Sequence, residues 1–183
     1  HYVLLNLPLM VKAEGAAHET LLAFFSAHLQ NPLSHTDYDL ALDGARNLVL
    51  LGQQDMRGKA LGVLKAEAVS GDFRRVDPAM RVFAEIFDRY VGTPERAAFM
   101  ADSMRAVDGF LGQIRLSDVS KKTQAYFEKT LGKASSLMAQ DIKSSKTKEE
   151  RVMYQSLRKQ TDALLRTFKN QLTAPGPSPV PNP

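Results

Sequence analysis

The chain of 183 residues is 44% hydrophobic and 24% charged, which is typical of a globular protein with one core or two small ones. It contains no cysteine, and this excludes disulfide bonds, thiolate zinc sites and a cysteine nucleophile. The net charge of +4 conceals an asymmetry, because residues 1–114 hold 11 Lys and Arg against 14 Asp and Glu, whereas residues 115–183 hold 13 against 6.

Residues 1–75 form an acidic N-terminal region that we expect to be helical, with a strand or β-hairpin as a further component. The apolar stretch 2–11 is compatible with a strand, which Pro8 would place at the edge of a sheet. Residues 17–30 predict a helix with its leucines and phenylalanines turned inward. No run in the chain approaches the ~20 apolar residues of a membrane span.

The stretch 39–51 allows two interpretations. Alternating residues before the turn signal Asp43-Gly44, and the apolar run after it, favour a β-hairpin. A helix that includes Gly44 is nearly as well supported, because short apolar runs do not separate helix from strand. Residues 56–69 then predict a helix that contains two glycines and ends at Gly71-Asp72.

Residues 76–173 predict a basic region of four helices. Asp77-Pro78 is typical of a helix start and Thr93-Pro94 repeats the signal, with Pro placed where a missing N–H costs nothing. Ser117 can cap a third helix. Thr147 with Glu150 has the capping-box spacing, so the fourth helix is expected to run from there to about Leu172.

The predicted fold is therefore mainly α: a bundle of about four C-terminal helices with a smaller N-terminal part, and an α+β fold as the alternative. Residues 174–183 contain five prolines and predict an extended, polyproline-like tail outside the bundle.

The helix predicted over 147–172 carries most of the functional signal. On a helical wheel its apolar residues except Val152 occupy one arc, and its cations share a broad face of nearly one sign, in which Asp162 is the exception. Such a face can be only the solvated side of the helix, can follow the phosphates of a nucleic acid, or can dock on an acidic partner. Lysines of the preceding helix would extend this face if the two helices pack side by side. The candidate nucleic-acid-binding residues are Lys148, Arg151, Arg158, Lys159, Arg166 and Lys169.

The remaining motifs are weak. Arg74-Arg75, just before a predicted helix start, is a candidate anion site. The loop that contains His35, Asp37 and Asp39 is the one candidate for a catalytic general base. His18-Glu19 lacks the second histidine of a zinc protease motif, and no phosphate-binding glycine loop is present, so we expect neither metal nor cofactor.

We therefore expect a non-enzymatic, cytoplasmic binding protein whose basic C-terminal helices contact nucleic acid. The alternative is a structural or assembly adaptor of a larger complex, in which the acidic part of one subunit meets the basic part of another and gives a homo-oligomer.

Overall fold

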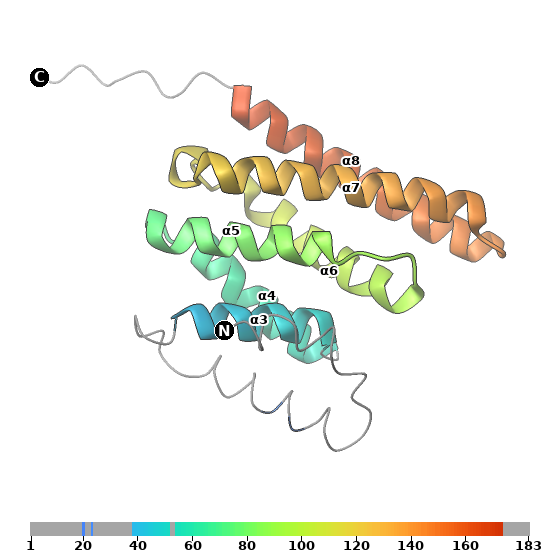
Figure 1. The fold of residues 1–183 in the computed structure, drawn as a ribbon, viewed down its shortest axis with the longest axis horizontal. Helices are drawn as coiled ribbons and strands as arrows, with labels where there is room; N and C mark the ends of the chain where they lie inside the picture. The colour runs from blue at the N-terminus through green and yellow to red at the C-terminus, as the bar shows by residue number, and fades with distance from the viewer. Residues whose placement is uncertain (1–19, 21–22, 24–37, 52–53, 174–183) are drawn as a thin grey trace, which may run out of the picture.

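A computed structural model describes residues 20, 23, 38–51 and 54–173 of the chain. Between residues 38 and 173 these form six α-helices and one 3₁₀ turn, without a β-strand (Figure 1), so the mainly α prediction is confirmed. The predicted strand at 2–11, the loop with His35 and the tail 174–183 lie outside the described residues, as does nearly all of helix 17–30. The elements are α3 (Tyr38–Leu51), α4 (Gln54–Ala68), α5 (Phe73–Asp88), α6 (Pro94–Leu111), η1 (Leu116–Asp118), α7 (Lys121–Ser144) and α8 (Lys148–Thr173).

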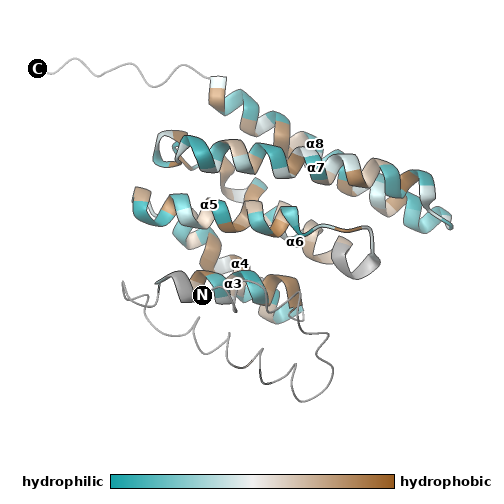
Figure 2. Cartoon of the chain, viewed as in Figure 1, coloured by the Kyte–Doolittle hydropathy of each residue, from teal (hydrophilic) through white to brown (hydrophobic). Residues whose placement is uncertain are grey.

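The helices pack in successive layers. The pair α7–α8 lies at one side of the molecule, α5 and α6 lie in the middle, and α3 with α4 lies at the opposite side (Figure 1). Hydrophobic and hydrophilic residues alternate along each helix, as expected where one side of a helix packs on a neighbour (Figure 2). A single apolar cluster contains residues of every helix from α3 to α8, and the boundary expected at 75–76 falls inside α5.

Aromatic side chains join the middle layer to its neighbours. The ring of Phe127 lies 5.6 Å from that of Phe87 and 4.9 Å from that of Phe168, which links α7 to both α5 and α8. Phe83 and Phe110 make a similar contact at 5.3 Å between α5 and α6. All five rings are almost completely buried. They therefore stabilise the fold both by the burial of apolar surface and by their tilted or edge-on contacts.

Residues 39–51 belong to α3, so the preferred β-hairpin prediction was wrong and the helical alternative holds. Every residue from position 41 to 49 is buried, and so short an apolar run does not by itself separate a buried helix from a buried strand. The charge of the buried Arg46 is compensated within the fold, since it pairs with Asp43 at 3.2 Å and with Glu85 of α5 at 2.7 Å.

Helix α5 begins before the predicted Asp77-Pro78 start. Gly71 has a φ of +73°, a conformation that favours glycine, and Asp72 then caps the helix by accepting a hydrogen bond from the Arg74 N–H. Pro78 therefore lies inside α5, where it has no N–H for the carbonyl four residues earlier. Asp77 instead accepts the backbone N–H of Ser120, 2.7 Å away.

That contact also fixes the start of α7. Ser120, and not Ser117 as predicted, is the N-cap, and its side chain accepts from the Thr123 N–H. Ser117 belongs to η1 instead. The starts predicted at Thr93-Pro94 and Thr147 are confirmed by α6 and α8. Within the described residues, no helix is both long and apolar enough to cross a bilayer.

The α5–α6 connection packs against the end of α7 at Gly92. The Tyr90 hydroxyl donates to the carboxylate of Asp141 at 2.8 Å, and burial together with this bond raises the pKa of Tyr90. The same carboxylate occupies the space that a Cβ on Gly92 would need. A side chain at this position would have to displace a hydrogen-bonded, partly buried group.

We therefore expect Gly92→Ala to lower the free energy of unfolding by about 1–3 kcal/mol, the usual cost of overpacking. Gly62→Ala in α4 is the matched control, because its added methyl meets nothing within 4 Å and removes the helix penalty of glycine. Urea unfolding should show this control unchanged or stabilised by up to about 1 kcal/mol. Equal stabilities of the two variants would contradict the tight contact at Gly92.

Candidate functional site

The start of α8 is held by reciprocal hydrogen bonds. The Glu150 N–H donates to the Thr147 hydroxyl at 3.1 Å, and the Glu150 carboxylate accepts the Thr147 N–H at 3.4 Å and the Lys146 N–H at 2.9 Å. This is the capping box that the sequence predicted. It fixes the first turn of the helix, from which Lys148 and Arg151 project.

The inner side of α8 packs in the hydrophobic core. Tyr154, Leu157, Leu164 and Phe168 are buried there. Thr161, also buried, donates its hydroxyl to the Leu157 carbonyl at 2.9 Å, so its polar group is satisfied within the helix. Val152, which lies off the predicted apolar stripe, is 55% exposed. The orientation of the whole helix is therefore fixed by its apolar side.

All six cations predicted on α8 are exposed to solvent. Two make ion pairs: Lys169 with Glu128 of α7 at 3.1 Å, and Arg158 with Asp162 at 3.7 Å. Arg166 donates to the Asp162 backbone carbonyl at 3.3 Å, which leaves its charge uncompensated. Within the part of the chain that the structure describes, three have neither ion pair nor hydrogen bond from their side chains: Lys148, Arg151 and Lys159.

Five lysines of α7 lie within an arc of about 120° on its solvent side, at about 100° per residue. Helix α7 packs alongside α8, where the Ser135 hydroxyl donates to Asp162 at 2.6 Å. Exposed Lys169 of α8 pairs with Glu128 of α7, so charged residues of the two helices adjoin where the helices lie side by side. We call the resulting surface the basic face, which comprises Lys121, Lys122, Lys129, Lys133, Lys143, Lys148, Arg151, Arg158, Lys159, Arg166 and Lys169.

The acidic residues of α7 and α8 offset little of this charge. Asp141 is engaged with Tyr90 at the α5–α6 connection, and Glu150 with the backbone in the capping box. Glu128 and Asp162 each have one cation of the basic face as an ion-pair partner. From α5, Asp88 pairs with Lys133 at 2.7 Å. Most of the cations therefore stand on this surface without a neutralising carboxylate.

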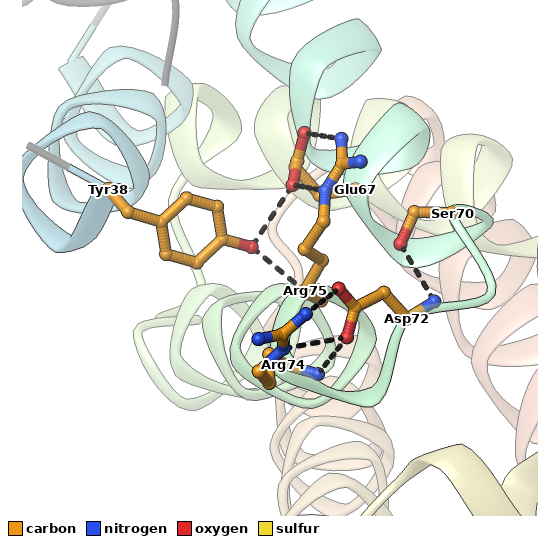
Figure 3. A network of polar contacts seen from close by, with 6 residues as sticks. All are labelled: Tyr38, Glu67, Ser70, Asp72, Arg74 and Arg75. Atoms are coloured by element: carbon orange, nitrogen blue, oxygen red, sulfur yellow. Dashed lines mark hydrogen bonds and ion pairs between the residues drawn. The ribbon is translucent and has the colours of Figure 1, made fainter. Parts of the chain in front are cut away.

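The candidate anion site at Arg74-Arg75 already contains carboxylates (Figure 3). Arg75 donates two hydrogen bonds, of 2.8 and 2.7 Å, to the buried carboxylate of Glu67, which also accepts from Tyr38. Arg74 pairs with Asp72 at 3.1 Å and holds the pKa of that carboxyl below its usual value. An external anion would have to compete with both, so these contacts do not favour the site, which stays a prediction.

A shallow depression between α4 and α6 is a feature that the sequence did not indicate. It has a volume of about 540 Å³ and is lined by Lys59, Asp102 and Arg105 beside the open backbone of Gly58. Of these lining residues, Asp102 also pairs with Arg57 at 2.7 Å. The described residues contain no group of three or more metal-ligating side chains, and all four histidines lie outside them.

Comparison of the chain with protein-family models, with curated proteins and with solved structures gave no match. Its function is therefore argued from its own residues.

Because Thr147 holds the first turn of α8, we expect Thr147→Ala to lower stability by about 1 kcal/mol, the usual value of such a cap. Thr147→Ser keeps the hydroxyl and should restore most of the loss. Thermal unfolding of the two variants in parallel measures this. An alanine variant as stable as the wild type would show that the capping box contributes nothing.

Proposed function

We propose that this protein binds nucleic acid through the basic face, by contacts between its cations and the phosphate backbone. The observation that supports this is the array of eleven cations on the solvent side of two packed helices, most of them without an internal partner. A helix side that only keeps a protein in solution usually mixes charges of both signs. A surplus of fixed positive charge attracts polyanions and releases their condensed counterions.

The strength of this binding depends on how many of the cations are free of ion pairs and hydrogen bonds within the protein. Lysines and arginines already paired with carboxylates release fewer counterions than free ones. Six of the cations have no polar contact within the described part of the chain: Lys122, Lys129, Lys143, Lys148, Arg151 and Lys159. If each meets one phosphate, the logarithm of the affinity should fall against the logarithm of salt concentration with a slope of roughly −5.

The alternative of self-association between acidic and basic parts has less support. Many carboxylates of α3–α6 are occupied by cations of the same part, as with Glu85 and Arg46, or Asp102 and Arg57. Within the part of the chain that the structure describes, few remain to receive the basic face of a second copy. The homo-oligomer stays a prediction, which light scattering at low and high salt would measure directly.

The proposal can be tested by reversing the charge of two cations that have no ion-pair or hydrogen-bond partner within the described residues. We expect Arg151→Glu with Lys159→Glu to weaken binding of an oligonucleotide at least tenfold at about 50 mM salt, and to flatten the salt dependence. The matched control is Lys59→Glu with Lys65→Glu, an equal change of charge on exposed residues of α4, at the other side of the molecule (Figure 1). Fluorescence anisotropy measures both. An equal loss in the two variants would point to net charge alone, and no loss in either would contradict the proposal.

Asp162 offers a test in the opposite direction, because it is the one carboxylate of α8 among the cations of the basic face. We expect Asp162→Asn to tighten binding by about two- to fivefold, since it releases Arg158 from its 3.7 Å ion pair. The asparagine carbonyl can still accept from the Ser135 hydroxyl, so the packing of α7 on α8 is retained. Unchanged or weaker binding would place Arg158 outside the contact surface.

A further inference from the structure

We propose that the nucleic acid bound by the basic face is a double helix, held by its phosphates without reading of its bases. This deepens the proposed function and rests on it.

The basic face lacks the side chains that hold single strands. Proteins that bind single-stranded DNA or RNA combine a basic groove with exposed aromatic rings on which the bases stack. Here Phe127, Tyr154 and Phe168 are buried in the core, and Tyr126 is half-buried. Burial, with Asp88 nearby, raises the pKa of Tyr126 to about 12. No aromatic side chain of α7 or α8 is exposed, so unpaired bases have no ring to stack on.

The length and rigidity of the face suit a duplex. Helix α7 has 24 residues and α8 has 26, so the two extend over roughly 36–39 Å at about 1.5 Å per residue. The cations are distributed from Lys121 and Lys169 at one end to Lys143 and Lys148 at the other. A duplex presents one charge per about 1.7 Å, twice the density of one of its strands. A rigid array of cations therefore meets more phosphates on a duplex than on a single strand of equal length.

The pairing of the two helices argues against base reading. The major groove is about 12 Å wide and admits one α-helix, whose own diameter is about 10–12 Å. Helix α8 is flanked by α7, to which the Ser135–Asp162 and Glu128–Lys169 contacts hold it. The pair is roughly twice as wide as the groove, with helix axes about 8–10 Å apart. Because both helices of the pair carry exposed cations, the pair fits across the phosphate backbones, where contacts position the protein but carry no sequence information.

A membrane surface fits the same charges less well. Helices that lie in the bilayer interface insert an apolar side between the lipids. The apolar side of α8 is in the core, where Leu157, Leu164 and Phe168 are at most 4% exposed. Val152 is the one large hydrophobic residue of α7 and α8 that is exposed. The basic face therefore has charge for an anionic surface but almost nothing to insert.

The test compares ligands of equal length on the full chain. Fluorescence anisotropy would be measured with a labelled duplex of about 24 base pairs, a second duplex of the same composition in permuted order, and one unstructured strand of that length. We expect the two duplexes to bind equally within about twofold and the single strand at least fivefold more weakly at about 50 mM salt. Vesicles containing phosphatidylserine should bind more weakly than either duplex.

The outcomes distinguish failure of the duplex inference from failure of the proposed nucleic-acid binding. A single strand bound as tightly as the duplex would overturn the inference but leave nucleic-acid binding intact, provided that Arg151→Glu with Lys159→Glu still weakens it. A difference of tenfold or more between the permuted duplexes would overturn the absence of base reading. Binding of neither nucleic acid, or tighter binding of vesicles, would overturn the proposed function as well.

Discussion

The ring of Phe127 is the contact on which the arrangement of the basic face depends. It packs on Phe87 of α5 and on Phe168 of α8, so it joins the α7–α8 pair to the middle layer and the two helices to each other. Once these inner sides are in the core, every charged residue of both helices must lie on the remaining surface, because burial of an unpaired charge is prohibitively costly. The hydrophobic core thereby determines where the positive charge collects.

Cations are paired with carboxylates more completely in α3–α6 than in α7 and α8. In the layers formed by α3–α6, cations and carboxylates come in numbers that allow pairing across helices, as in Arg46 with Glu85 and Arg57 with Asp102. These partly buried pairs fix how the helices sit against one another, although their net contribution to stability is small. On α7 and α8 cations outnumber acidic residues, and several acidic residues serve internal contacts. Most of the cations there consequently have no ion-pair partner among the described residues.

At the connection between α4 and α5, charged and polar side chains join three helices. Gly71 reverses the chain, Asp72 caps α5, and Arg75 returns to the buried carboxylate of Glu67 (Figure 3). The Tyr38 hydroxyl also donates to Glu67, which ties α3 to the same point. A buried carboxylate requires such partners, and the arginine supplies them from within the chain.

The sequence by itself determined the helical class, the starts of α6 and α8, and the single-sign face of α8, because capping residues and helical periodicity act within one or two turns. It did not determine that residues 39–51 are helical, since positions 41–49 of α3 are all buried and short apolar runs fit a helix and a strand alike. Nor could it show that Asp77 holds Ser120, or that Arg75 is bound to Glu67, because these partners are 43 and 8 residues apart. Tertiary packing alone placed the lysines of α7 beside those of α8, since that depends on how the two inner sides meet in the core.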